Sequence, residues 1–170
     1  MQTCSNGLRK GSTAMSHSLT KIWIHTTFST KGRTTSIQPA FEMELLQHIK
    51  EHLEQDFDCP VRAINRTTDH IHILFLLNPN HAVKDILKNV KGESSHWVNQ
   101  GDFSKFKFAW QTGYAAFSVS EFGVPTVAEY IRNQKEHHRR KTFAEEYEEL
   151  VRKHGLTWEP ETVETVFEGG

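Results

Sequence analysis

Two histidines separated by one residue are the first candidates for chemistry in this 170-residue chain. His70, Ile71 and His72 begin the stretch HIHILFLL, whose apolar and β-branched residues predict a strand. Side chains alternate along a strand, so both imidazoles point to one face of the sheet and Ile71 points to the other. Two imidazoles placed in this way can share one divalent metal ion. Because the chain has eleven histidines, the pattern also fits two ordinary surface histidines.

A tyrosine and a glutamine four residues apart form the second candidate pair. Tyr130 and Gln134 fall in a segment that predicts a helix, where positions i and i+4 share a face one turn apart. Gln134 offers an amide oxygen, a hard ligand suited to Mg²⁺ or Mn²⁺. Tyr130 offers a phenol, whose ordinary pKa of about 10 must be lowered before it can act as a nucleophile. The competing interpretation is a Tyr130 packed on the sheet and a Gln134 on the surface.

His25 begins the tripeptide His-Thr-Thr on another predicted strand and supplies one HxT motif. A pair of HxT motifs is the signature of a different class of phosphoesterase. The second motif is missing, since the tripeptide from His70 to His72 has no hydroxyl at its third position. We therefore disfavour that class.

The elements that must position these residues alternate between strand-like and helix-like stretches. Strands are expected at residues 21–30, 59–67, 70–77 and 114–120, and helices at about 39–57, 81–99, 125–139 and 142–154. Pro39 and Pro125 suit the first turn of a helix, and Thr142 with Glu145 predicts a capping box.

The order of the first six elements is strand, helix, strand, strand, helix, strand, which is the split βαβ arrangement. The expected fold class is therefore α+β and ferredoxin-like, a four-stranded antiparallel sheet with two helices on one face. The C-terminal helices carry Tyr130. Either these helices or a second subunit must cover the other face of the sheet.

Length and composition favour one folded domain with tails. Residues 1–18 are expected to be a disordered extension, residues 19–156 the single domain, and residues 157–170 an acidic tail. Met15 is an alternative start to Met1. Hydrophobic residues make up 36% of the chain, and no apolar run approaches the roughly 18 residues of a membrane span. Eleven Phe, four Trp and three Tyr exclude a fully disordered chain.

The formal net charge of −1 implies no overall attraction to nucleic acid, so a phosphate-binding surface must come from local clusters. One such cluster runs from Arg132 to Lys141, with five basic residues and a single acidic one. The two cysteines, Cys4 and Cys59, form no CxxC motif and predict a reduced, cytoplasmic protein.

Five segments together resemble one known family. They are HTTFSTKGR at 25–33, AINRTTDHIHIL at 63–74, KNVKGESSHWVN at 88–99, FAWQTGYAAFSVS at 108–120 and YIRNQKEHHRRKTFAEEY at 130–147. In kind and order they resemble the HUH single-tyrosine transposases of small insertion sequences, the insertion-sequence-200-like family. The resemblance spans about Ile24 to Leu156.

This resemblance implies a DNA transposase that cleaves and rejoins single-stranded DNA at the ends of its element. Family members are dimers that recognise hairpins near those ends. Tyr130 would be the nucleophile, giving a 5′-phosphotyrosine link and a free 3′-OH without nucleotide hydrolysis. His70, His72 and Gln134 would hold the metal, Mg²⁺ or Mn²⁺. Tyr130 and Gln134 can lie in the same subunit as the histidine pair or in its partner.

The resemblance also implies a location and a set of DNA contacts. The protein would act in the cytoplasm, at the nucleoid. Plausible contacts to the DNA backbone are Lys31, Arg33, Lys91, Arg139 and Arg140.

Two other functions stay open at this point. One is a domesticated relative that shares the chemistry and processes repeated palindromes; only the DNA flanking the gene separates it from a mobile element. The other is a non-catalytic, ferredoxin-like binder of single-stranded nucleic acid, which predicts exposed aromatic residues on the central strands. The sequence leaves open the target sequence, the hairpin, the metal, and whether translation begins at Met1 or Met15.

Overall fold

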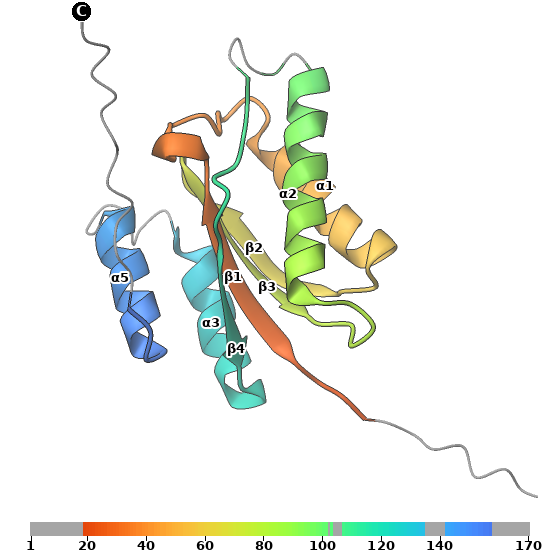
Figure 1. Ribbon diagram of the computed structural model, residues 1–170, viewed down its shortest axis with the longest axis vertical. Coiled ribbons are helices and arrows are strands. Elements are labelled where there is room, and N and C mark those ends of the chain that lie inside the picture. Colours follow the sequence, from red (N-terminus) through yellow and green to blue (C-terminus); the bar gives the residue numbers. More distant parts are fainter. Residues whose placement is uncertain (1–18, 102, 104–106, 135–141, 158–170) are drawn as a thin grey trace, which may run out of the picture.

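The computed structural model describes residues 19–101, 103, 107–134 and 142–157. Its centre is a four-stranded antiparallel sheet in the order β2-β3-β1-β4 (Figure 1). The strands are β1 (Trp23–Ser29), β2 (Val61–Arg66), β3 (His70–Leu76) and β4 (Ala115–Val119). The helices are α1 (Glu42–Asp56), α2 (Val83–Gln100), α3 (Val124–Arg132) and α5 (Phe143–Lys153). Short 3-10 turns lie at η1 (Lys31–Arg33) and η2 (Glu121–Gly123). This arrangement confirms the predicted fold class.

The main core lies between the sheet and the pair α1 and α2. Ile71, Ile73 and Phe75 project from β3 into this core, and all three are fully buried. They pack on the apolar positions of α1 and α2, which recur with the helical period: Leu45, Leu46, Ile49 and Leu53, and Ile86, Leu87, Val90 and Val98. The strand alternation predicted for β3 is therefore confirmed on this face.

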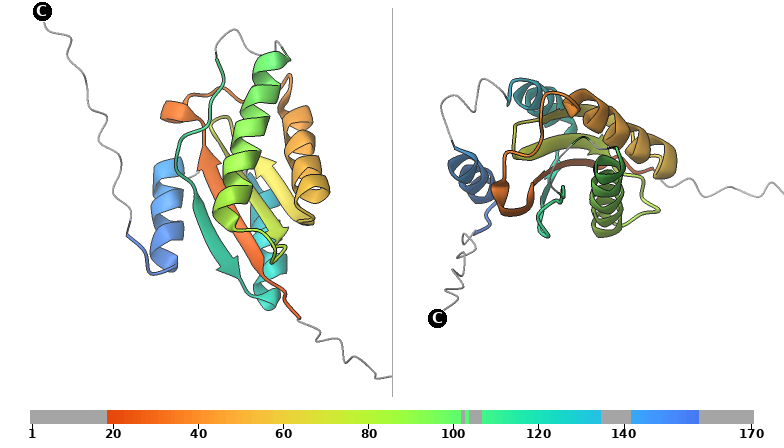
Figure 2. Two further views of the ribbon diagram at one scale, coloured as in Figure 1. Left: turned by 45° about the vertical axis from the view of Figure 1, so that its right-hand side comes forward. Right: turned by 90° about the horizontal axis from the view of Figure 1, so that it is seen from above.

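The other face of the sheet is covered by α3 and α5. Figure 1 shows α3 and α5 on the side of the strands opposite α1 and α2, and the turned view on the left of Figure 2 places α3 behind the sheet. Ala128 and Ile131 of α3 pack on Leu74 of β3, and Val151 of α5 packs on Ala115 and Phe117 of β4. The sequence left open whether helices of the same chain or a second subunit cover this face. In the structure, helices of the same chain cover it.

Helix boundaries differ from the predictions at two places. The helix expected to open at Pro39 begins at Glu42, because Phe41 is drawn into the core, fully buried and stacked on Phe103, with its backbone outside helical geometry. The helix expected to reach residue 139 is described as α3 to Arg132, with residues 135–141 outside the described part of the chain. The capping box at Thr142 and Glu145 is present as predicted. No described helix has the length and apolarity needed to cross a membrane.

Candidate active site

The two histidines of β3 lie on the sheet face under α3 and α5. His70 is fully buried and His72 is 1% exposed, so the alternative of two surface histidines is wrong. The His70 Nδ1 atom lies 2.7 Å from a carboxylate oxygen of Asp69 and 2.7 Å from the hydroxyl of Thr67. A histidine whose Nδ1–H donates to a carboxylate carries its lone pair on Nε2, and such a contact is the usual support of a metal-binding imidazole.

His72 is held by a neighbour that sequence analysis did not assign to the site. Strand β1 pairs with β3 so that Thr27 is opposite His72 and Ser29 is opposite His70. His25, on the same face of β1, places its Nε2 3.1 Å from the Nδ1 of His72. That contact directs the Nε2 of His72 away from β1 and toward α5.

Burial sets the charge of His25. Desolvation, reinforced by the nearby His154 and opposed by Glu146, lowers the pKa of His25 from 6.5 to about 4. His25 is therefore neutral at physiological pH. A neutral His25 can accept the Nδ1–H of His72 through its Nε2, which leaves the Nε2 of His72 deprotonated.

Tyr130 reaches the site from α3, and Gln134 reaches it from the second residue after the end of that helix. The side-chain amide of Asn65, on β2, donates to the carbonyls of Ile131 and Arg132, at 2.9 Å each, and so ties the end of α3 to the sheet. The Tyr130 ring lies edge-on to His72, with 5.8 Å between ring centroids. Gln134 is fully buried, so the surface position considered for it is wrong.

Glu146 of α5 completes the cluster, and it was not predicted. The Tyr130 hydroxyl donates to Glu146 Oε1, and the Gln134 amide donates to the same oxygen at 3.0 Å. Oε2 of Glu146 lies 3.9 Å from the Nε2 of His70, and Oε1 lies 3.9 Å from the Nε2 of His72. Burial, with the hydrogen bond and negative charge of Glu146, raises the pKa of Tyr130 above its ordinary value. Without a cation the phenol is therefore held protonated.

The residues present fit a divalent metal ion. One ligand atom each from His70, His72 and Glu146 lies within 4.8 Å of the other two. Ligand atoms of a single ion at about 2.1 Å stand no more than about 4.2 Å apart, so the two 3.9 Å separations suit a shared ion. Within the described residues, the buried Gln134 Oε1 and Thr27 Oγ1 atoms have no hydrogen-bond partner. Both oxygen atoms can therefore act as further ligands of an ion at this site.

Of the predicted DNA contacts, Lys31, Arg33 and Lys91 lie in the described part of the chain, and none of these three belongs to the buried cluster. Lys31 and Arg33 form the exposed turn η1, directly after β1. Lys91 is partly buried and donates to the backbone carbonyls of Thr112 and Gly113, at 2.8 and 2.9 Å, so it braces a loop. Arg139 and Arg140 are outside the described residues.

The structure thus brings four predicted residues together within one chain, and it adds two. His70, His72 and Gln134 are buried and meet the half-buried Tyr130 in one cluster, joined by His25 and Glu146. His25 could have been found from the pairing of β1 with β3, which places it on the sheet face that carries His72. Glu146 gave no such signal. It stands next to Glu145 of the capping box, four residues after Thr142, and nothing in that position indicated a role in the site.

Comparison with known proteins decides the family. The sequence profile of the family described as transposase IS200-like matches residues 18–134, well over half of the chain. The chain belongs to this family. It is a transposase, and the enzyme class expected from the sequence, an HUH single-tyrosine transposase, is confirmed. No curated protein matches the chain.

Two solved structures share the fold. One is a protein named as a transposase of Deinococcus radiodurans R1, 22% identical, with a TM-score of 0.55; the match covers 70% of this chain and 95% of the other. The second is a REP-associated tyrosine transposase bound to a REP hairpin, 15% identical, with a TM-score of 0.54 and coverage of 73% and 74%. At these identities the likeness concerns the fold.

Proposed function

We propose that this transposase cleaves and rejoins single-stranded DNA through a covalent link between Tyr130 and a 5′-phosphate. The observation that supports this most strongly is the buried cluster in which the Tyr130 hydroxyl and the two imidazoles of β3 surround one carboxylate. A phenol beside a set of metal ligands suits phosphodiester transfer to tyrosine, since the ligands can hold an ion next to the attacking oxygen.

The ligands we propose for a divalent ion, Mg²⁺ or Mn²⁺, are His70, His72, Glu146 and the amide oxygen of Gln134. Two nitrogens and harder oxygens form a mixed set, and carboxylate and amide oxygens are the preferred donors for both ions. When bound, the ion would polarise the scissile phosphate and stabilise the charge on the departing oxygen. Asp69 and His25 are positioning residues, since each fixes the ring orientation of one histidine.

The chain's own residues account for the remaining chemistry. The Tyr130 oxygen attacks the phosphorus atom, a P–O bond to Tyr130 forms, and the bond to the 3′-oxygen breaks. The proton of Tyr130 passes to Oε1 of Glu146, which already accepts its hydrogen bond, while Oε2, 3.9 Å from the Nε2 of His70, would serve as the ligand atom. The departing 3′-oxygen takes a proton from water and leaves as a 3′-OH. Attack of a 3′-OH on the phosphotyrosine releases the Tyr130 oxygen, which regains its proton, and so reverses the step and rejoins the DNA. Because the bond energy stays in the covalent link, no nucleotide is hydrolysed.

The proposed substrate is single-stranded DNA that carries a hairpin, and the solved relative bound to a REP hairpin supports this choice. We include a homodimer acting in the cytoplasm, at the nucleoid, in the proposal. Tyr130 and the histidine pair meet within one chain, so the chemistry does not require exchange of α3 between subunits. Light scattering during gel filtration gives the subunit number.

The rival, a non-catalytic nucleic-acid binder, gains little support from the central strands. Phe28 of β1 and Phe75 of β3 are buried in the α1 and α2 core, so neither offers an open stacking surface. A domesticated relative would share the chemistry, and terminal palindromes around the gene would identify a mobile element instead.

Cleavage of labelled DNA tests the proposal. Single-stranded DNA from the flanks of the gene, incubated with the protein and Mg²⁺ or Mn²⁺, should yield a cut strand with a 3′-OH. Tyr130→Phe should abolish cutting while hairpin binding remains. His70→Ala, checked for folding by its unfolding transition, should remove metal-dependent cutting. Cutting by either variant at the normal rate contradicts the assignment of that residue.

A further inference from the structure

A basic groove runs along α2, on the sheet face opposite the active-site cluster. A hollow of about 400 Å³ lies between α2 and the segment leading into β4. Tyr114 forms an aromatic wall of this hollow. The other side chains that matter here are polar or basic: Lys84, Lys88, Lys91, Ser95 and Gln111. Lys84, Lys88 and Lys91 are spaced four and three residues apart, which places them on one face of the helix. We call this hollow the α2 groove.

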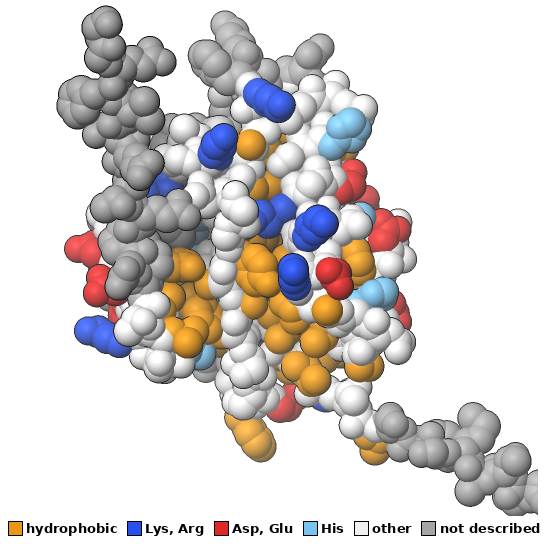
Figure 3. Space-filling model, in the orientation of Figure 1, with side chains coloured by type: hydrophobic (Ala, Val, Ile, Leu, Met, Phe, Trp, Pro, Cys, Tyr) orange, Lys and Arg blue, Asp and Glu red, His pale blue; other side chains and the backbone are white. Residues whose placement is uncertain are grey.

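Positive charge is concentrated there although the whole chain is nearly neutral. None of the described residues that line the α2 groove is acidic. Of the acids of α2, Glu93 is engaged with His48 of α1, and Asp85 is exposed beside Lys84 but does not line the groove. Figure 3 shows lysine and arginine side chains gathered on this face, over α2 and the segments beside it. Such local segregation is what a near-neutral protein needs to attract phosphates.

The wall of the groove is held in place by hydrogen bonds. Lys91 donates to the carbonyls of Thr112 and Gly113, which fixes the loop before β4 against α2. On its other side the same segment joins η1, since the backbone N–H of Lys31 donates to the Ala109 carbonyl at 2.9 Å. The segment leading into β4 therefore lies between the basic turn η1 and the α2 groove.

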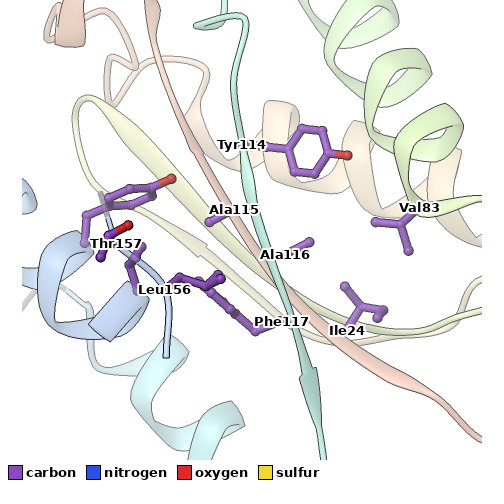
Figure 4. A pocket seen from close by; sticks show the side chains of 10 residues that line it. Ile24, Val83, Tyr114, Ala115, Ala116, Phe117, Leu156 and Thr157 are labelled. Atoms are coloured by element: carbon purple, nitrogen blue, oxygen red, sulfur yellow. The ribbon is translucent and has the colours of Figure 1, made fainter. Parts of the chain in front are cut away.

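The groove ends close to the catalytic residues. Ala115 pairs with Thr27, and Thr27 pairs with His72, so two strand spacings of about 4.8 Å, roughly 10 Å in all, separate the start of β4 from His72. β4 is the edge strand, so a DNA strand leaving the groove can pass around it. Figure 4 shows the Tyr114 ring, at the start of β4, directed toward α2, while Phe117 lies on the side of Leu156.

We propose that the α2 groove binds a single-stranded segment of the DNA substrate, with Lys84 and Lys88 on its phosphates and Tyr114 stacked on an unpaired base. This inference rests on the proposed function. Tyr114 suits the role because its ring lines the groove and its side chain is 38% exposed. Lysines along the backbone with an aromatic ring between them form the usual platform for an unpaired strand.

Salt-dependent binding tests the groove. A fluorescent single-stranded oligonucleotide is titrated onto the Tyr130→Phe protein, so that no cleavage occurs, at several salt concentrations. Each phosphate contact contributes about 0.7 to the slope of log K against log salt. The double variant Lys84→Gln and Lys88→Gln should lower the slope by about 1.4, a loss of about 25-fold in affinity at 0.1 M salt.

The matched control is Lys21→Gln with Lys50→Gln, which removes the same charge from sites outside the groove. The control should keep the wild-type slope. Equal losses in the two double variants, or no loss in the groove variant, overturn the inference. Tyr114→Ala should weaken binding about tenfold and Tyr114→Phe should retain it; equal binding by Tyr114→Ala removes the stacking role.

The groove and the proposed chemistry fail in different ways. If the wild-type protein forms no covalent adduct with the same oligonucleotide and Mn²⁺, the proposed function fails whatever the binding data show. If the adduct forms but the groove variant binds with an unchanged slope, the α2 groove alone is refuted.

Discussion

The acid sensitivity of the metal-free protein depends on His25, the buried neighbour of His72. The change to make is His25→Gln, because the Gln amide can still meet the Nδ1 atom of His72 but does not titrate. Folding lowers the pKa of His25 from 6.5 to about 4 through burial. Between these two values the unfolded chain binds a proton at His25 and the folded protein does not, so the free energy of unfolding falls as the pH falls.

The size of the effect follows from the two pKa values. Above pH 6.5 both states are neutral at His25, and the residue adds no pH dependence. By pH 5 the wild type should lose about 2 kcal/mol of stability through this residue, and about 3 kcal/mol once the pH is below 4. The His25→Gln protein should lack this component, so its stability relative to wild type should improve by those amounts as the pH falls.

Urea unfolding followed by tryptophan fluorescence, in chelator and at several pH values from 7.5 to about 4.5, measures the difference. His96→Gln, an exposed histidine of α2, serves as the control and should run parallel to wild type. A difference between wild type and His25→Gln that does not change with pH would refute a neutral, buried His25, and with it the proton arrangement proposed for His72.

Three further predictions concern α5 and the core. Glu146→Gln should lower the pKa of Tyr130 in the metal-free protein, since burial remains but the negative charge is gone; absorbance titration near 295 nm, with Tyr130→Phe as reference, measures it, and identical curves would speak against the contact. Thr142→Ala removes the capping box of α5 and should cost about 1 kcal/mol of stability in urea unfolding; an unchanged midpoint would show that α5 is not part of the cooperative unit. Burial raises the pKa of the Cys59 thiol, so in a Cys4→Ser protein a thiol reagent should label Cys59 only after unfolding; rapid labelling of the folded protein would contradict its burial.

Local sequence pattern predicted much of the site because its residues are related by short, regular spacings. The alternation of β3 placed His70 and His72 together. The helical repeat predicted that Tyr130 and Gln134 lie together, and they do, although α3 ends at Arg132, two residues before Gln134. Both relations depend only on backbone geometry, so they can be predicted without knowledge of the tertiary structure.

The missed residues depend on contacts between elements distant in the sequence. His25 meets His72 only through the register of β1 on β3, and a shift of one residue would turn its ring to the other face. Glu146 enters through the packing of α5 on β4. The helical spacing of Tyr147, Leu150 and Val151 indicates which face of α5 packs, but not which strand it meets. In the same way, the start of α1 was misplaced because burial of Phe41 outweighed the preference of proline for a first turn.

The central claim is that Tyr130 carries the DNA, and mass spectrometry of the covalent product tests it most directly. The protein is incubated with single-stranded DNA from the gene's flanks and Mn²⁺, digested with nuclease and protease, and the modified peptide is sequenced. We predict a nucleotide attached through its 5′-phosphate to Tyr130 and to no other residue. A nucleotide on Tyr114 or Tyr147, or an adduct that persists in Tyr130→Phe, would contradict the account.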